Sequence, residues 1–431
     1  IILQINKTLN VGGIKLELMT KYQYTYFIYP YVIEEKNYKR YLQNLVRNKK
    51  CKIRFFDEQK DIHLYTYFLP SIREYMLWSF GLSKKAIREY EKSDTTLKAT
   101  MLAEKECNIF NYELPENLQG KVQDDNGIFF EISEIKIICF KTGICFLVFK
   151  TNLESSNSFT EILNFNYKFR EINSISYNMK EYENIRIQSN SFKNVKDIST
   201  LIKELTGKDN ISKKANIGND KFYVYSYTCL DQKDWNDNTE VQELNRLFER
   251  FRTVQPANTQ IINDEYAINN IEDRNRESIY KNQYIRYGFT ATSTVLFTSN
   301  INTTNFTVVP QKFESEYLYT YILVLYKKMM LNKLNYQFKN NFKDAEIGFL
   351  DFTKKLWIQD ITNEDFGRRL EKNWVDNMNI ESTYNKLKNE YDIAYKKHNV
   401  EELNKNNKIT RIIVGVILII NIITIIYASL K

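Results

Sequence analysis

The sequence predicts an α+β (mixed α/β) domain, followed by a long stalk helix and a C-terminal transmembrane helix. Three observations carry this prediction. Aromatic and β-branched runs alternate with helical stretches over residues 1–310, without a regular βαβ rhythm. No proline follows Pro310, which is typical of long helices. Positions 412–428 (IIVGVILIINIITIIYA) carry no charge. The expected domains are therefore residues 1–310, 311–411 and 412–431.

Several segments of the first domain have the aromatic and β-branched composition of strands. They are Tyr24–Ile33, Ile135–Phe140, Ile144–Phe149, Lys221–Cys229 and Ile285–Phe297. Lys141-Thr142-Gly143 joins the second segment to the third and predicts a β-hairpin. Gly288 is expected at a bulge or turn of the last segment. Helices are expected at Asp197–Thr206 and Asn238–Arg252.

The composition disfavours several classes of protein. The only histidines are His63 and His398, which excludes zinc sites built on several histidines. Only 12 glycines and 5 prolines are present, which disfavours Gly-rich phosphate loops. A net charge of +8 is too diffuse over 431 residues to indicate a nucleic-acid polymer as partner. No cofactor is evident, and we do not expect an enzyme.

The five cysteines form no C-x-x-C pair and are odd in number, which indicates a reduced, cytosolic interior. Cys139 and Cys145 lie on the two arms of the predicted hairpin. A cross-strand disulfide is one alternative, and two buried thiols are the favoured one.

Three helices are expected to lead into the stalk. They are Ser315–Phe338, Ala345–Gln359 and a helix that begins near Thr362. The first half of the first helix, Tyr317–Tyr326, is apolar on nearly all sides. Because a membrane span needs about 20 residues, we expect a buried core helix there.

Apolar residues of the stalk repeat at 4-3 spacing, which predicts a helix with one packed seam. The seam runs through Ile380, Tyr384, Leu387, Tyr391 and Ala394, and it resumes at Val400, Leu403, Asn407 and Thr410 after a phase slip near His398. The spacing is compatible with a coiled coil or with one long helix packed against a neighbour. We favour a stalk that packs on copies of itself.

The apolar run at positions 412–428 has the length of a membrane span. Lys405, Lys408 and Arg411 precede it, whereas Lys431 alone follows it. The positive-inside rule therefore predicts that the preceding domain lies in the cytoplasm.

Two polar residues, Asn421 and Thr424, interrupt the span. Extending the seam in 4-3 steps gives a line of six residues, hereafter the span line. It consists of Thr410, Val414, Ile417, Asn421, Thr424 and Ala428. Polar groups inside a bilayer usually face another helix or water, so we expect helices to associate along the span line. The product is either a closed bundle held by Asn421 or a pore lined by it.

With these features, the chain resembles the CorA-type metal-ion transporter family. The resemblance rests on the architecture and on three stretches in the second half of the chain. They are YGFTATSTVLF (Tyr287–Phe297), FESEYLYTYILVLYKKMMLNKL (Phe313–Leu334) and FTKKLWIQDITNEDFG (Phe352–Gly367). The resemblance implies a pentameric funnel in the bacterial cell membrane, a pore lined by the span line and a divalent cation such as Mg²⁺ as the transported ion.

The sequence departs from the family pattern at its end. The family closes its first transmembrane helix with Gly-Met-Asn and continues into a second span, whereas here the helix reaches Tyr427-Ala428-Ser429-Leu430-Lys431. Magnesium selectivity is attributed to that motif, so magnesium transport is less expected than the pore itself. Some divergent members of the family are membrane effectors of type III CRISPR defence that a nucleotide messenger opens, which implies a small nucleotide ligand.

The resulting hypothesis is a homo-oligomeric cation channel or transporter gated by its cytosolic domain. The alternative is a single-pass, tail-anchored scaffold or a membrane-disrupting effector without ion selectivity. Two further clusters are weaker candidates. Asp231, Asp234 and Asp237 are compatible with a cation site, although a solvated acidic turn is favoured. Arg246, Arg250 and Arg252 are compatible with a phosphate-bearing ligand, although a solvated helix face is favoured.

Overall fold

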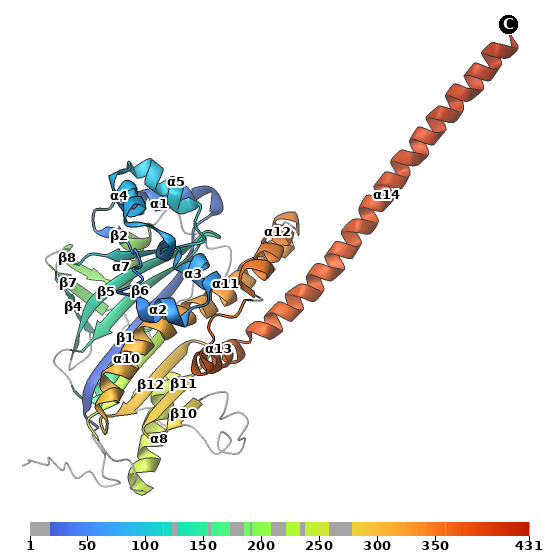
Figure 1. Cartoon of the computed structure of the whole chain (residues 1–431). Coiled ribbons are helices and arrows are strands. Elements are labelled where there is room, and N and C mark those ends of the chain that lie inside the picture. The colour runs from blue at the N-terminus through green and yellow to red at the C-terminus, as the bar shows by residue number, and fades with distance from the viewer. Residues whose placement is uncertain are drawn as a thin grey trace, which may run out of the picture.

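The computed structural model describes most of the chain (Figure 1). The described residues are 18–114, 116–122, 127–153, 157–172, 185–189, 192–207, 221–232, 238–257, 278–340, 342–357 and 359–430. They form a twisted sheet with helices on both faces, from which one long C-terminal helix projects. The predicted α+β class with long C-terminal helices is confirmed.

The sheet is built around strand β1 (Thr20–Val32), which pairs antiparallel with β6 (Ile144–Asn152) and β9 (Tyr223–Leu230). From one edge, the described strands run β10 (Ser278–Asn282), β11 (Ile285–Phe289), β12 (Ser293–Ser299), β9, β1, β6, β5 (Ile128–Phe140), β4 (Leu118–Val122), β7 (Ile185–Ser189) and β8 (Phe192–Asp197). Beside β4, strand β5 also pairs with β3 (Cys107–Tyr112), which in turn pairs with β2 (Cys51–Ile53). Among these pairs, β9–β12 is parallel and the others are antiparallel.

Both faces of the sheet are buried, because successive side chains of a strand point to opposite faces. Tyr26 and Ile28 of β1 belong to one hydrophobic core, and Phe27 and Tyr31 belong to the other. The first core is covered by α2 (Ile62–Tyr67), α3 (Pro70–Met76), α11 (Leu318–Asn340) and α13 (Asp365–Asn377). The second core is covered by α1 (Glu35–Arg47), α5 (Thr95–Ala103), α6 (Phe159–Phe169), α7 (Ile198–Thr206) and α8 (Asn238–Thr253). Helix α4 (Lys84–Lys92) also contributes Tyr90 to the second core.

Helix α11 is the buried core helix that its apolar first half predicts. Tyr321, Ile322 and Leu325 have no exposed surface, and they share the first core with strand residues. The chain enters α11 through α10 (Val308–Lys312) and a π-helical turn, Phe313–Tyr317. The last described strand, β12, precedes Pro310 and the long helices follow it, and residues from both sides share the first core.

Most of the predicted strands and helices lie where expected, with one correction. The Lys141-Thr142-Gly143 hairpin forms between β5 and β6, and Gly143 adopts a positive φ of 83°. The segment Ile285–Phe297, in contrast, is two antiparallel strands, β11 and β12, with the turn after Phe289. Gly288 lies inside β11, where a Cβ atom would come within 2.8 Å of the Arg252 side chain. This glycine therefore permits close packing of α8 on the sheet.

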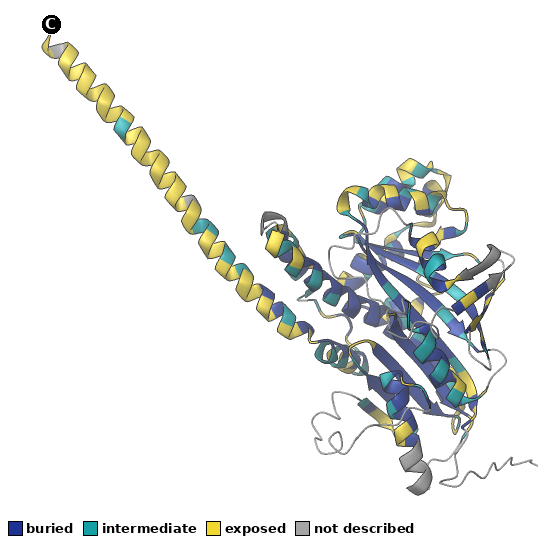
Figure 2. Cartoon of the chain, turned by 180° about the vertical axis from the view of Figure 1, so that it is seen from behind, coloured by how far each residue is buried: buried dark blue, intermediate teal, exposed yellow. Residues whose placement is uncertain are grey.

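The predicted helix Ala345–Gln359 corresponds to α12 (Phe342–Phe352) and a second π-helical turn, Thr353–Trp357. Helix α14 (Ile380–Ser429) follows α13 and is a single helix of 50 residues, which is about 75 Å long. Its first turns pack on the body, and its remaining turns project alone (Figures 1 and 2). Among the described residues, α14 is the one helix that is long and apolar enough to cross a membrane.

Candidate functional site

The base of α14 is held by stacked aromatic rings. The ring of Tyr384 lies 3.9 Å from that of Trp357, nearly parallel to it, and 5.5 Å from that of Phe349. Two turns further, Tyr391 lies 5.3 Å from Phe349 and 6.2 Å from Phe338. We call these five residues the aromatic clamp. Because they come from α11, α12, the second π-helical turn and α14, the clamp joins the helix to the helical layer over the sheet.

The first half of the predicted seam is therefore already packed within one chain. Ile380, Tyr384 and Leu387 are buried, and Tyr391 is half-buried, against α11 and α12. Of the two interpretations that the spacing leaves open, a helix packed against a neighbour describes this half, and the neighbour is the chain's own helical layer.

The second half of the seam is exposed and lies on a different face of α14. Val400 and Leu403 are exposed, as are Val414 and Ile417 of the span line. At 3.6 residues per turn, the phase slip near His398 turns the span line by about 110° around the helix from the packed seam residues Ile380, Tyr384, Leu387 and Tyr391. Figure 2 shows the projecting part of α14 as almost wholly exposed. The span line can therefore contact another molecule while the aromatic clamp holds the base of α14 on its own chain.

The three polar side chains of the span line differ in their hydrogen bonds. The Thr410 hydroxyl donates to the Asn406 carbonyl at 2.8 Å, and the Thr424 hydroxyl donates to the Ile420 carbonyl at 2.8 Å. Both bonds lie within the helix and need no second chain. The Asn421 amide makes no side-chain hydrogen bond to the described part of the chain. Ala428 lies in α14, but its side chain is outside the described set.

The basic residues before the span lie away from the span line. Relative to Thr410, Arg411 is turned by about 100°, Lys408 by about 160° and Lys405 by about 220° around the helix. If helices meet along the span line, these cations face outward, where they can interact with anionic lipid head groups.

The weaker arginine candidates lie at different depths of α8. Arg246 is exposed, whereas Arg250 and Arg252 are buried. The Arg250 guanidinium donates to the Ala257 carbonyl. Arg252 donates to the Glu249 carboxylate at 2.7 Å and to the Phe289 carbonyl at 3.0 Å. Both buried arginines thus fasten α8 to neighbouring backbone.

The weaker aspartate candidates are described only in part. Asp231 is exposed at the end of β9 and accepts a hydrogen bond from the Asn300 amide. Asp234 and Asp237 lie outside the described residues. Within the described ranges, no three His, Cys, Asp or Glu side chains are grouped as metal ligands.

The five cysteines are free and buried, as expected for thiols in a reduced interior. Cys139 and Cys145 are direct partners across the β5–β6 hairpin. Burial raises the pKa of Cys139 well above its usual range, and it raises the pKa of Cys51 to about 12. Because the thiolate is the reactive form, these thiols are chemically quiet.

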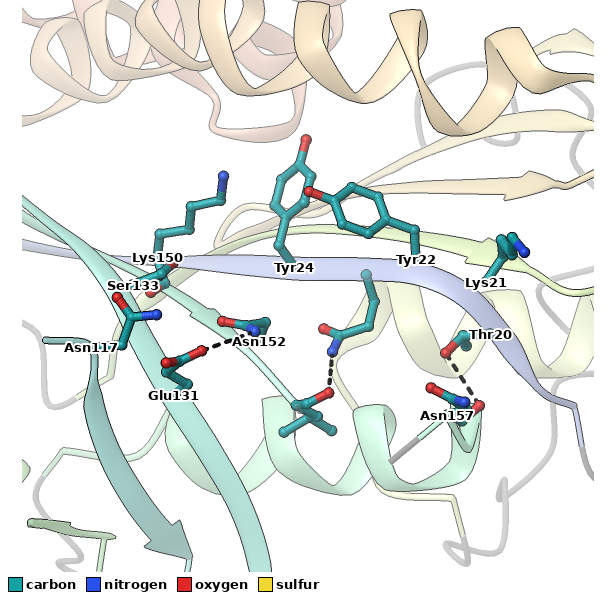
Figure 3. A pocket seen from close by; sticks show the side chains of 12 residues that line it. Thr20, Lys21, Tyr22, Tyr24, Asn117, Glu131, Ser133, Lys150, Asn152 and Asn157 are labelled. Atoms are coloured by element: carbon teal, nitrogen blue, oxygen red, sulfur yellow. Dashed lines mark hydrogen bonds between the residues drawn. The ribbon is translucent and has the colours of Figure 1, made fainter. Parts of the chain in front are cut away.

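A first cavity, of about 300 Å³, lies where β1 loses its pairing with β6 (Figure 3). Tyr24 and Lys150 line it together with Glu131 and Asn152. The Lys150 ammonium lies 2.5 Å from the Glu314 carboxylate, and the buried Glu131 carboxylate accepts from the Asn152 amide at 3.4 Å. Residues 154–156, between β6 and Asn157, are outside the described set.

A second cavity, of about 250 Å³, lies at the junction of the sheet and the helical layer. We call it the junction cavity. Its lining comes from α1, α3, the β5–β6 turn, α11, α12 and the second π-helical turn. Sequence reasoning missed it, because no local pattern indicates that residues as distant as Glu35 and Lys355 line one space.

Comparison with known proteins yields no relative for this chain. No family model, no curated protein and no solved structure matches it.

Proposed function

We propose that the protein is a homo-oligomeric membrane channel or transporter for cations, in which α14 helices gather along the span line. The observation that carries this proposal is the Asn421 amide, which has no hydrogen-bond partner in the described chain and lies on an exposed face that the clamp does not use. A second copy of the same helix supplies the partner that one chain lacks.

The bilayer explains why such an amide favours assembly. The apolar window of α14 has a mean hydropathy of 2.6 and no buried residues in the single chain, which is the opposite of a core helix. In hydrocarbon, water cannot satisfy the amide, so hydrogen bonding between neighbouring helices stabilises their association by about 1 kcal/mol per helix. The outward position of Lys405, Lys408 and Arg411 avoids like-charge repulsion in the centre of the bundle.

Control by the sheet domain would act through the aromatic clamp. Between the clamp and Asn421, α14 contains no proline, and its one glycine is Gly415. A rotation or tilt of the base is therefore carried along the helix to Val414 and Ile417. The constriction that these apolar side chains form would widen and fill with water in the open state. Five copies, a divalent cargo, the cytoplasmic side for the sheet domain and a role in antiviral defence are proposed from the resemblance and the charge flanks.

The test uses the full chain in detergent and in lipid vesicles. Asn421→Leu is expected to lower the oligomer mass measured by native mass spectrometry, or to change ion flux through vesicles, without altering the fold of the sheet domain. The matched control moves the amide to the opposite face, as Asn421→Leu combined with Ile423→Asn, and it is expected not to restore the wild-type oligomer. An unchanged mass and flux in Asn421→Leu, or a monomeric wild type, contradicts the proposal, and a monomer favours the tail-anchored alternative.

A further inference from the structure

The junction cavity is lined by two ammonium groups that still have donors to offer. Lys333 of α11 donates to the Glu35 carboxylate at 2.7 Å and to the Thr142 carbonyl at 2.6 Å. Lys355 of the second π-helical turn donates to Glu106 at 2.8 Å and lies 3.0 Å from Asp351. An ammonium has three N–H donors, so each lysine keeps one for a further acceptor.

Three hydroxyl groups of the lining form one ordered chain, and Gln337 is the other uncharged polar side chain of the lining. Tyr75 donates to the Tyr326 hydroxyl at 3.2 Å, and Tyr326 donates to the Thr142 hydroxyl at 3.2 Å. The Thr142 hydroxyl is left as a donor beside Lys333. Met330 and Phe352 supply an apolar wall. The cavity thus presents donors beside a hydrophobic surface, which is the usual composition of a site for a small organic ligand.

Two of the three carboxylates that now pair with these lysines, Glu35 and Asp351, are more exposed than their lysine partners, whereas Glu106 is less exposed than Lys355. The side chain of Lys333 is 10% exposed and that of its partner Glu35 is 68% exposed. Asp351 is 51% exposed, whereas Lys355 is 42% exposed. Exposed ion pairs contribute little to stability. Glu35 and Asp351 can therefore turn into water and give up their places to an incoming anion, while Lys355 keeps its hydrogen bond to Glu106.

The cavity also touches the elements that hold α14. Lys355 faces the cavity, and Trp357, two residues further in the same π-helical turn, stacks on Tyr384. On α12, Gly348 and Phe352 line the cavity, while the neighbouring Phe349 belongs to the aromatic clamp. Short π-helical segments are frequent at functional sites. A ligand that pulls on Lys355 therefore acts on the base of α14 through a few residues.

We propose that the junction cavity binds a small organic molecule with two acidic groups, a dicarboxylate or a diphosphate, and that binding changes how the aromatic clamp holds α14. One acidic group exchanges with Glu35 at Lys333, and the other exchanges with Asp351 at Lys355. The volume of about 250 Å³ suits a molecule of this size and is below the usual range for drug-sized ligands. Binding itself does not depend on the channel, whereas its regulatory consequence rests on the proposed function.

Binding is tested by calorimetry on the full chain in detergent, with inorganic pyrophosphate and succinate as separate probes. Lys355→Met and Lys333→Met are each expected to weaken binding of the preferred probe about tenfold or more, because a hydrogen-bonded charge partner is lost. Lys354→Met is the matched control, since Lys354 is exposed and does not line the cavity. It is expected to bind as the wild type does. Should Lys333→Met fail to fold, the more exposed Lys355 keeps the test valid.

Removal of the carboxylate that competes with the ligand is expected to strengthen binding, which is the opposite of the effect of the lysine variants. Glu35→Gln is expected to tighten binding by up to about fivefold, because the ligand no longer competes with a carboxylate at Lys333. Failure of both probes to bind at millimolar concentration, or equal binding by wild type and Lys355→Met, overturns the site. The preferred probe distinguishes a phosphate-bearing ligand from a carboxylate.

The effect on the clamp is read from Trp357 fluorescence, with Trp357→Phe as the blank. The preferred probe is expected to shift the emission of the wild type but not that of Lys355→Met. Binding without a shift overturns the coupling to α14 and leaves the site intact. Binding with a shift but without any change of ion flux in vesicles counts against the proposed channel and leaves both the site and its coupling intact.

Discussion

The two parts of α14 share one helix and one residue spacing, yet they differ in what they contact. At the base, Leu387 is 2% exposed and lies in the first core of the body. Further along, Leu403 follows the same 4-3 spacing and is 62% exposed. The base belongs to the folded chain, whereas the apolar residues Val400, Leu403, Val414 and Ile417 further along are exposed.

This difference shows that a 4-3 spacing predicts a packed helix face but does not indicate what packs against it. The phase slip near His398 indicates that two different faces are involved, because it turns the apolar face away from the clamp. One face packs within the chain, and the other is exposed in the single chain. The following predictions test whether the two faces are as independent as their placement indicates.

The largest effect is expected from a cavity at the base. Leu387→Ala removes a fully buried side chain and is expected to lower the free energy of unfolding by about 2–5 kcal/mol. Leu403→Ala is the matched control, with an expected change within about 0.5 kcal/mol because its site is exposed in the single chain. Urea unfolding of the full chain in detergent, followed by tryptophan fluorescence, measures both. Equal losses in the two variants would contradict the division of α14 into two faces.

A charge on the outer face is expected to act on assembly instead. Leu403→Asp places a carboxylate where a second stalk would cover the leucine side chain. Burial of that side chain would stabilise the assembly by about 1.5–3 kcal/mol per helix. We expect a smaller oligomer by native mass spectrometry, with the thermal unfolding of the body unchanged. Lys405→Asp, on the side away from the span line, is the control for the added charge. If both variants assemble alike, the stalks do not meet on the face of Leu403.

Much of the fold follows from local patterns in the sequence. The β5–β6 hairpin is strongly predicted, because two apolar runs joined by a short turn form few other structures. Helix α11 is strongly predicted, because its first half is apolar on nearly all sides. The sequence predicts a strand segment at Ile285–Phe297 with a bulge or turn at Gly288. The turn lies instead at residues 290–292, which contain neither glycine nor proline. Gly288 is needed for a close approach to Arg252, and this requirement comes from tertiary packing.

The candidate site was predicted less completely. Asn421 was identified from its polarity within an apolar run, which is a local signal. The structure adds that the hydroxyls of Thr410 and Thr424 donate to carbonyls of their own helix, which leaves the Asn421 amide as the polar group of the span line without such a bond. The aromatic clamp and the junction cavity depend on residues that are far apart in the sequence. One chain without aligned relatives offers no pattern that brings Trp357 onto Tyr384.

A smaller effect is expected from the ring stack that joins the two regions. Trp357→Leu keeps an apolar side chain but loses the stacking on Tyr384, which contributes about 0.5–1.5 kcal/mol beyond burial. We expect lower protection of amides in the first turns of α14 in hydrogen exchange, and unchanged protection in the strands. Trp78→Leu is the matched control, because Trp78 lies in a different region and packs on Phe55 at 6.3 Å. Uniform loss of protection in both variants would mean that the clamp is not a separate contact.

The smallest effect is expected at the second polar residue of the span. Thr424→Val keeps the shape of the side chain and removes a hydroxyl that already donates to the Ile420 carbonyl of its own helix. Oligomer dissociation on dilution in detergent is therefore expected to stay within a few tenths of a kcal/mol of wild type, against about 1 kcal/mol per helix for Asn421→Leu. If Thr424→Val weakens the oligomer as much as Asn421→Leu does, the hydroxyl has a partner on another chain. If it leaves the oligomer intact but alters ion flux, Thr424 faces water, and the span line is the lining of a pore rather than the seam of a closed bundle.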